Sequence, residues 1–358
     1  NGFVDWLVEE GIRRPGQALL PTTDELAWLF ARHARVLSRW FRLDVPPAAV
    51  IYRLLNKVRL AEACARVGLE TPATRLYESD AQVSRLARTL QYPVVVKPQT
   101  QVLLSPHQKG RVVDGPQALL PAVHDFLRST RQARALLDFD PGVARPMLQA
   151  YLPPAAGVYS LTGFIDRSGD VFVTRACRKV FQRPRLLGVG LCFEAAEVDP
   201  SIAARVRALC REVGYHGVFE AELLEGGADP VLIDFNPRFY GQVALDVARG
   251  LDQPRLAWLQ AVGDEPGLRA AAAQMQAPPP GAPDAWCDRV HLELFLASIR
   301  VVGASGVDAA KWRRWLVAHR ASVADPLIDP GDWAPAAVVA LTSLALSVRH
   351  PRSTWRQA

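Results

Sequence analysis

The stretch VLIDFNPRFYGQ, residues 231–242, alternates apolar and polar side chains and then continues to a cation. Successive side chains of a β-strand point to opposite faces, so Asp234 and Asn236 share a face and Arg238 continues their row. An aligned carboxylate, amide oxygen and guanidinium can bind a metal ion and the phosphate beside it. The alternative is a solvated face whose polar groups simply point into water.

A second acidic strand precedes this stretch and is expected to pair with it. GVFEAELLEGGADP, residues 217–230, contains a strand and then the turn residues glycine, aspartate and proline. If the two strands form a hairpin, Glu222 lies opposite Asp234 on the same face. Glu220 then lies opposite Asn236, with about 5 Å between opposed Cβ atoms. The hairpin therefore gathers three carboxylates on one face.

These carboxylates repel one another unless a cation lies among them. Oxygen ligands from Glu, Asp and Asn suit Mg²⁺, which proteins usually hold through one or two carboxylates and the phosphates of a substrate. We therefore predict that Glu222, Asp234 and Asn236 bind Mg²⁺ or Mn²⁺. Arg238, at the rim of that site, is predicted to act in catalysis on a phosphate that bridges the metal and its guanidinium.

An acidic residue followed twelve residues later by IDFNPR resembles the metal-binding hairpin of the ATP-grasp superfamily, whose usual form is an acid, a hairpin and Glu/Asp-x-Asn-x-Arg. Three other segments follow that family's order: LLNKVRLAEACARVGLETPAT (54–74), YPVVVKP (92–98) and PMLQAYLPPAAGVYS (146–160). The resemblance covers roughly two-thirds of the chain, from Ala18 to Gln260. It implies an α+β ATP-grasp fold that uses ATP and Mg²⁺, and it is strongest to the carboxylate–amine ligase branch, which includes D-aspartate ligase and carbamoyl-phosphate-synthase-like enzymes.

The resemblance also implies which residues bind ATP. Lys57 and Lys97 stand in the two lysine positions and would bind the phosphates. Lys97 ends an apolar strand, so its stem is buried while its ammonium group reaches a cleft. The hinge between the two lobes would present backbone groups to adenine from Gln149, Ala150, Tyr151 and Leu152. Leu224 would form a floor under the base, or pack in the core.

A third basic segment, RKVFQRPR at 178–185, occupies a region that often contacts phosphate or the acceptor carboxylate in such ligases. We predict Arg178 and Lys179 as its catalytic residues. The alternative is the solvated edge of a strand. Tyr240 and Gln242, just past the hairpin, are further candidates for contact with substrate.

The resemblance implies an ADP-forming C–N ligase: a small-molecule carboxylate attacks ATP, and an amine captures the acyl phosphate. Amino acids are among the candidate substrates. No serine, histidine or cysteine constellation indicates covalent catalysis, as expected where phosphoryl transfer depends on positioning and charge. Two alternatives stay open, an ATP-dependent carboxylase or thiol ligase of the same fold and a non-catalytic nucleotide-binding module. The second is kept open by the loop at 99–110, which contains only Gly110 where the family usually has several glycines.

The elements that must position these residues follow from the apolar periodicity and the turn residues. We expect a strand end at 18–20 and a helix over 21–41 that starts with a Thr22–Glu25 capping box. A second helix is expected over 49–67, closed by Gly68. Beyond it, we expect mainly strands from 145 to 240, interrupted by a helix at 202–214, with a flexible stretch at 186–194.

This pattern divides the chain into a partial N-terminal α/β subdomain (1–48), an ATP-grasp domain with lobes at 49–147 and 148–265, and a mostly helical C-terminal extension (266–358). A proline-rich connector, QAPPPGAPD at 276–284, lies inside the extension. The apolar stretch 334–348 is expected to be a buried helix rather than one at a membrane surface.

Composition narrows the remaining choices. With 358 residues, 49% of them hydrophobic, the chain can bury a large core, and no apolar run reaches the ~18 residues that span a bilayer. The formal charge of +6 comes from scattered arginines without a recognised motif, so no nucleic-acid partner is expected. The five cysteines form no CxxC pair and are predicted to be reduced core thiols of a cytoplasmic protein. A homodimer is compatible with all of this.

Overall fold

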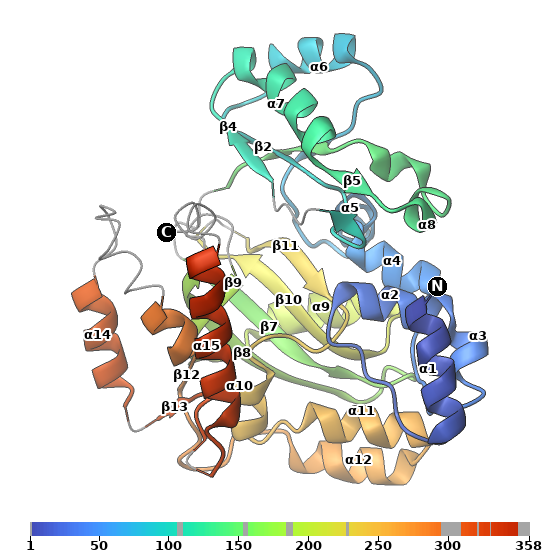
Figure 1. Cartoon of the computed structure of the whole chain (residues 1–358), viewed down its shortest axis with the longest axis vertical. Coiled ribbons are helices and arrows are strands. Elements are labelled where there is room, and N and C mark those ends of the chain that lie inside the picture. Colours follow the sequence, from blue (N-terminus) through green and yellow to red (C-terminus); the bar gives the residue numbers. More distant parts are fainter. Residues whose placement is uncertain are drawn as a thin grey trace.

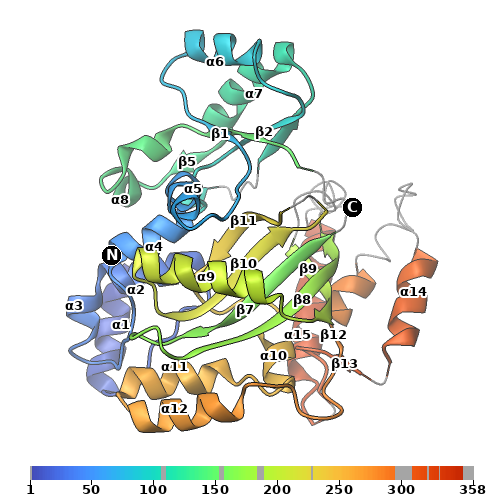
Figure 2. The ribbon, with the colours of Figure 1, turned by 180° about the vertical axis from the view of Figure 1, so that it is seen from behind.

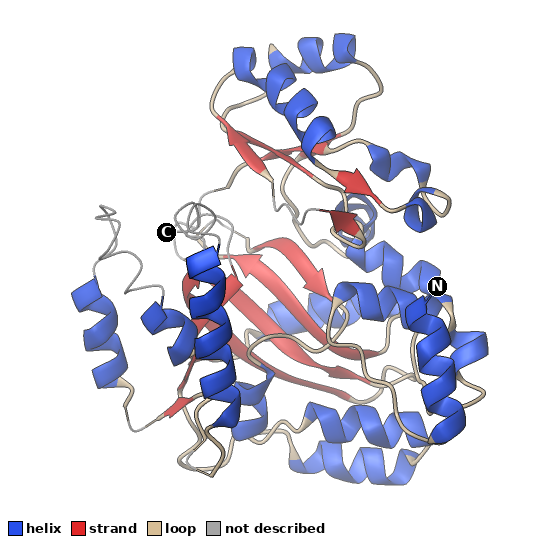
Figure 3. Ribbon diagram, viewed as in Figure 1, coloured by secondary structure: helices blue, strands red, loops and turns tan. Residues whose placement is uncertain are grey.

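The computed structural model describes residues 2–105, 110–152, 157–183, 189–226, 229–294, 309–320, 322–329 and 331–349. Figure 1 shows a smaller lobe, which contains β2 (Val94–Lys97) and α7 (Pro116–Ser129), above a larger lobe built on a long sheet. In both lobes, helices pack against a mostly antiparallel sheet (Figure 3), as expected for the predicted α+β class.

The smaller lobe is an antiparallel sheet with helices on one face. Its strands run in the order β1 (Thr74–Arg75), β6 (Met147–Ala150), β2, β4 (Arg111–Val113). Helix α6 (Asp80–Ala87) and α7 bury the apolar face of this sheet, with Val94, Val96 and Leu148 in the shared core. The alternate residues of β2 point the other way, towards the larger lobe. A short pair, β3 (Leu104–Ser105) and β5 (Arg131–Gln132), is followed by α8 (Arg134–Leu137) and a 3₁₀ turn at Pro141–Ala144.

The larger lobe is a seven-stranded sheet in the order β11-β10-β7-β8-β9-β12-β13. Its members are β7 (Val158–Ile165), β8 (Phe172–Arg183), β9 (Val189–Ala196), β10 (Gly217–Leu224), β11 (Val231–Asn236), β12 (Ala285–Cys287) and β13 (Val323–Ala324). Every residue of β7 is buried, because α9 (Pro200–Val213) covers one face and α11 (Gln253–Val262) contacts it from the other (Figure 2). Further helices of this half include α10 (Val243–Ala248), α12 (Glu265–Gln274), α14 (Ala309–Ala318) and α15 (Ala334–Arg349).

The two long helices expected near the N-terminus are each broken. The first becomes α2 (Asp24–Arg32) and α3 (Ala34–Leu37), and Thr23 rather than Thr22 caps it, accepting a hydrogen bond from the backbone of Leu26 at 3.2 Å. The second becomes α4 (Ala48–Leu55) and α5 (Lys57–Arg66). Asn56 causes that break, because its side chain caps α5 instead of continuing the helix.

The structure also differs from two other expectations, the strand end at 18–20 and the flexible stretch at 186–194. The strand end at 18–20 is only an isolated bridge between Ala18 and Arg42, and the regular secondary structure described within residues 2–48 is helical, starting with α1 (Gly2–Arg13). The stretch 186–194 was expected to be flexible, but its described part belongs to β9, which pairs with β8 and β12; residues 186–188 lie outside the described ranges.

The prediction of a buried helix at 334–348 is wrong. Helix α15 packs through its Ala336 side and turns larger apolar residues outward, so that Val338, Leu341 and Leu344 are 58%, 67% and 56% exposed. Within the described ranges, none of the helices combines the length and apolarity needed to cross a membrane. All five cysteines are buried free thiols, as expected.

Candidate active site

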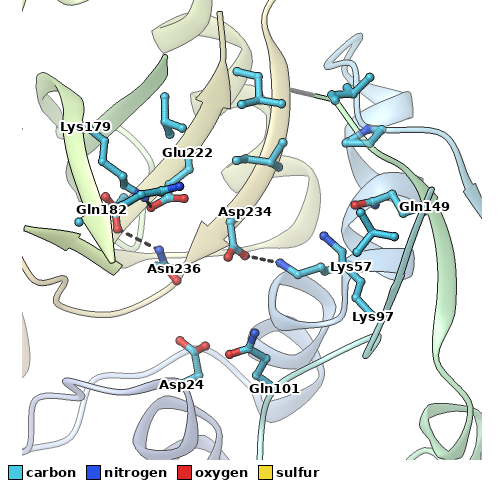
Figure 4. Close-up of a pocket in the computed structure, with 18 of the residues that line it drawn as sticks. Asp24, Lys57, Lys97, Gln101, Gln149, Lys179, Gln182, Glu222, Asp234 and Asn236 are labelled. Atoms are coloured by element: carbon cyan, nitrogen blue, oxygen red, sulfur yellow. Dashed lines mark hydrogen bonds and ion pairs between the residues drawn. The ribbon is translucent and has the colours of Figure 1, made fainter. Parts of the chain in front are cut away.

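A cavity of about 320 Å³ lies between the two lobes, and most of the site residues predicted from the sequence line it (Figure 4). Its walls include the hinge-side strand β6, the end of β2, the start of α5, the β10–β11 hairpin, parts of β8 and β9, and the first residue of α2. A concave site lined by convergent charged groups between two lobes is the usual place for a ligand.

The β10–β11 hairpin has the predicted register. Glu222 pairs with Asp234, and Glu220 pairs with Asn236. The register shifts by one residue after Glu222, so that Leu224 pairs with Val231 at the turn end of the hairpin. Glu222, Asp234, Asn236 and Leu224 all line the cavity. The pairing confirms that the acidic row is one face of one hairpin.

The carboxylates of Asp234 and Glu222 each already contact a lysine. The Nζ of Lys57 donates to Oδ1 of Asp234 at 2.7 Å, and the Nζ of Lys179 donates to Oε1 of Glu222 at 2.8 Å. Over the described ranges, no three His, Cys, Asp or Glu side chains converge into a complete metal cage. The donor set nonetheless fits a metal–nucleotide complex, since Mg²⁺ commonly takes only one or two protein carboxylates and completes its shell with phosphate and water.

Lys57 and Lys97 reach the cavity from α5 and from the end of β2, and Figure 4 shows their ammonium groups directed into the same space. The break at Asn56 is what turns Lys57 inward, because it makes this residue the first of a new helix. Lys97 follows three buried valines, as the sequence predicted. Gly110, the single glycine of the loop, has φ +131° and passes so close behind Lys97 that an added Cβ would lie 2.7 Å from the lysine Cβ.

The hinge segment lines the cavity through Gln149, Ala150, Tyr151 and Leu152. The backbone N–H groups of Ala150 and Tyr151 are already bonded to the carbonyls of Ala73 and Pro93, at 2.9 and 3.2 Å. Any contact with a base would therefore use other groups of this segment. The Gln149 side chain donates to Oγ1 of Thr74 at 2.9 Å, which fixes it beside the cavity.

The basic segment of β8 divides between two faces. Lys179 points into the cavity and is 7% exposed, whereas Arg178 does not line it. Arg178 forms a two-pronged ion pair with Glu225, at 2.8 and 2.9 Å. Of the two predicted residues, only Lys179 lines the cavity, because neighbouring residues of a strand point to opposite faces. Burial lowers the pKa of Lys179, but the carboxylates of Glu222 and Glu220 outweigh it, so the net shift of this pKa is upward and the ammonium stays charged.

Arg238 is fixed by three hydrogen bonds. Its Nε donates to Oδ1 of Asp24 at 2.6 Å, its Nη2 to Oδ1 of Asn236 at 3.0 Å, and its Nη1 to the carbonyl of Phe239 at 2.8 Å. Burial raises the pKa of Asp24, although the charge of Arg238 opposes this. Sequence reasoning missed Asp24, since nothing in a helix start indicates a contact 214 residues away.

Asn236 and Glu220 of this row belong to a buried polar network. Asn236 donates from Nδ2 to Oε2 of Glu220 at 2.9 Å, and Gln242 donates to the other carboxylate oxygen. Burial and the charge of Glu222 raise the pKa of Glu220 to about 7. Both residues are buried, but Gln242 lines the cavity, whereas Tyr240 does not and is bonded to Gln253 at 2.7 Å, so Gln242 is the better placed of these two candidates. Gln101 and Gln182 also line the cavity and were not anticipated.

No protein-family model and no curated protein matches the chain. Solved structures do. The biotin carboxylase domain of Hydrogenobacter thermophilus 2-oxoglutarate carboxylase, in complex with MgADP, ADP and bicarbonate, aligns at TM-score 0.59 and 17% identity over 72% of this chain and 56% of that one. An L-amino acid ligase from Bacillus licheniformis aligns at 0.53 and 15% identity, over 74% and 61%.

A third structure, a biotin carboxylase–beta-gamma-ATP complex from Campylobacter jejuni, aligns at TM-score 0.53 and 17% identity over 70% of this chain and 54% of that one. The chain thus spans only 54–61% of the length of these three proteins. Likeness at such low identity concerns the arrangement of the backbone. Together with the two-lobed α+β architecture and the hairpin register, it shows that the chain has the ATP-grasp fold.

Proposed function

We propose that this protein is an ADP-forming ligase that activates a carboxylate with ATP and transfers the acyl group to an amine. The observation that carries the proposal is the convergence of Glu222, Asp234 and Asn236 with Lys57 and Lys97 on one cavity. Oxygen ligands facing two ammonium groups form a site for a metal-bound polyphosphate. The same fold is found in ligases and carboxylases that use ATP.

Each part of the nucleotide would have its own place in this cavity. Adenine would lie against Gln149–Leu152 and over Leu224, and the phosphates would extend towards Lys57 and Lys97. Glu222, Asp234 and Asn236 would hold Mg²⁺, or Mn²⁺, which when bound neutralises phosphate charge. Arg238 would bind the γ-phosphate or the substrate carboxylate through the N–H groups that Asp24 and Asn236 leave free.

We propose the following reaction at these positions. An oxygen of the substrate carboxylate attacks the γ-phosphorus, whose bond to the β–γ bridging oxygen breaks and leaves ADP. The amine nitrogen then attacks the acyl carbon, releases phosphate and loses its proton. Lys179 keeps its charge because of Glu222 and Glu220, so it can stabilise the negative charge that develops on the transferred phosphoryl group.

A carboxylase reaction is the second candidate, since bicarbonate is itself a carboxylate-like acceptor and is present in the H. thermophilus structure. Amino acids are candidate substrates of the ligase reaction. We further propose a cytoplasmic location, on the five buried free thiols. A homodimer remains part of the proposal, because the similar H. thermophilus domain is described as a dimer.

The test is ADP release from Mg-ATP across panels of carboxylates, with bicarbonate among them, and amines, with hydroxylamine added to trap an acyl phosphate as a hydroxamate. Asp234→Asn should abolish ADP release and leave the fold intact. Asp229→Asn is the matched control on the same hairpin, because Asp229 pairs with Arg205 outside the cavity and is 53% exposed. Nucleotide binding without ADP release from any carboxylate would indicate a non-catalytic nucleotide-binding module.

A further inference from the structure

The end of the cavity opposite the hinge carries both signs of charge. Asp24, Gln101, Arg238 and Gln242 line it, and we name this group the Asp24 end. Figure 4 shows Asp24 and Gln101 next to each other, below the strand that carries Asp234 and Asn236 and apart from Gln149. The phosphates of a nucleotide that binds at the hinge would point here, so this is where its reaction partner must lie.

Asp24 and Arg238 form an ion pair that retains binding capacity. Three hydrogen bonds occupy the guanidinium, which has five N–H groups, so two of them are left for a ligand. The described contacts of Asp24 use only Oδ1, which leaves Oδ2 as an acceptor. The two side chains keep 25% and 19% of their surface exposed at the cavity. Both partners can therefore bind a molecule placed across them.

The sign of the charges selects the kind of molecule. A simple carboxylate that binds to Arg238 would lie next to the carboxylate of Asp24 and be repelled by it. A molecule with an ammonium group one or two bonds from its carboxylate avoids this, because each of its charges meets the opposite one. An α-amino acid has this arrangement, and the amides of Gln101 and Gln242 add neutral hydrogen-bonding groups around it.

We infer that Asp24 is a specificity residue, which binds the ammonium group of an amino acid whose carboxylate is activated beside Arg238. The inference rests on the proposed function and adds the substrate class to it. It also gives α2, which precedes the predicted ATP-grasp domain in the sequence, a direct contact with substrate.

The experiment compares matched pairs of substrates. Mg-ATP is incubated with each of the common L- and D-amino acids and, separately, with the corresponding des-amino acid, such as alanine against propionate, and ADP release is measured. We expect kcat/KM for the preferred amino acid to exceed that for its des-amino counterpart by about 100-fold or more. Asp24→Asn keeps an oxygen for Arg238 but removes the charge, so this ratio should fall towards 1 while the Kd for ATP changes less than about threefold.

Two variants complete the design. Asp24→Glu retains the charge and should retain the preference, whereas Asp125→Asn, an exposed carboxylate of α7, is the matched control without effect. Equal rates for both members of each pair in the wild-type protein overturn the inference and need no variant. An equal loss for both members in Asp24→Asn also overturns it, because Asp24 then only orients Arg238. ADP release from des-amino acids alone refutes the inference and leaves the proposed function standing, whereas no release from any carboxylate refutes both.

Discussion

Removing the ammonium group of Lys57 should change the affinities for free metal and for ATP in opposite directions. Lys57 lies 2.7 Å from the Asp234 carboxylate, so a metal ion that binds Asp234 must first displace it. At an effective dielectric constant of about 20, charges at this distance attract by roughly 6 kcal/mol. The Asp234 side chain is 42% exposed, and water screens such pairs, so we expect about 1 kcal/mol to survive.

Lys57→Met should therefore bind free Mg²⁺ about fivefold more tightly than the wild-type protein, since about 1 kcal/mol corresponds to that factor. The same change should weaken ATP binding by about 1–3 kcal/mol, because a charge-assisted hydrogen bond to phosphate is lost. Titration calorimetry with Mg²⁺ alone, and then with ATP, measures both. In the wild-type protein each ligand should strengthen the binding of the other, as the lysine moves from carboxylate to phosphate.

The matched control is Arg59→Met on the same helix. Arg59 pairs with Asp140 at 2.9 Å outside the cavity, so its loss should leave the Mg²⁺ affinity unchanged. If Lys57→Met binds Mg²⁺ no better than the wild-type protein, then either the ion pair does not form in solution or Asp234 is not a metal ligand. The second result would remove the basis of the metal assignment, whereas the first would only refute the competition between Lys57 and the metal.

Three other predictions concern single residues. Lys179→Met should lower kcat by about 100-fold with a smaller change in the ATP Kd, whereas Arg178→Met, outside the cavity, should leave both nearly unchanged in steady-state and binding assays. Gly110→Ala should displace Lys97 and weaken ATP binding by tenfold or more, with a loss of about 1–3 kcal/mol in the free energy of unfolding. Burial raises the pKa of Asp44, but the contacts with His216 and Arg167 lower it by more, so the net shift of this pKa is downward. The ionised Asp44 therefore stabilises the fold at neutral pH, and this stabilisation is lost as the pH falls below about 4. Asp44→Asn should thus lower the unfolding free energy by about 1–3 kcal/mol at pH 7, and urea titrations should show this difference shrinking in acid.

The hairpin could be predicted because local rules determine it. Two alternating strands joined by turn residues leave little freedom in register, so the pairing of Glu222 with Asp234 follows from the chain itself. The division between Arg178 and Lys179 could not be predicted in this way. Ala176 and Cys177, just before them, are both fully buried, so β8 has no apolar and polar alternation to show which face meets the cavity.

Contacts between distant segments were also out of reach. The partner of Arg238 is Asp24, and no periodicity connects a helix start with a residue 214 positions later. The break at Asn56 was hidden for another reason. The apolar pattern of α4 and α5 continues through it at helical spacing, and only the capping hydrogen bonds of Asn56 reveal that the helix stops and restarts there. The two lysines could be placed only by the family resemblance.

The strand β12 determines where this chain can be shortened. The proline-rich connector at 276–284 resembles a domain boundary at which the C-terminal extension could be removed. The very next segment, however, pairs with β9, placing Trp286 opposite Phe193, a residue of the cavity wall. Truncation at the connector would leave β9 with a row of unsatisfied backbone groups, which promotes aggregation. Residues 285–287 therefore belong to the smallest unit that preserves the active-site sheet.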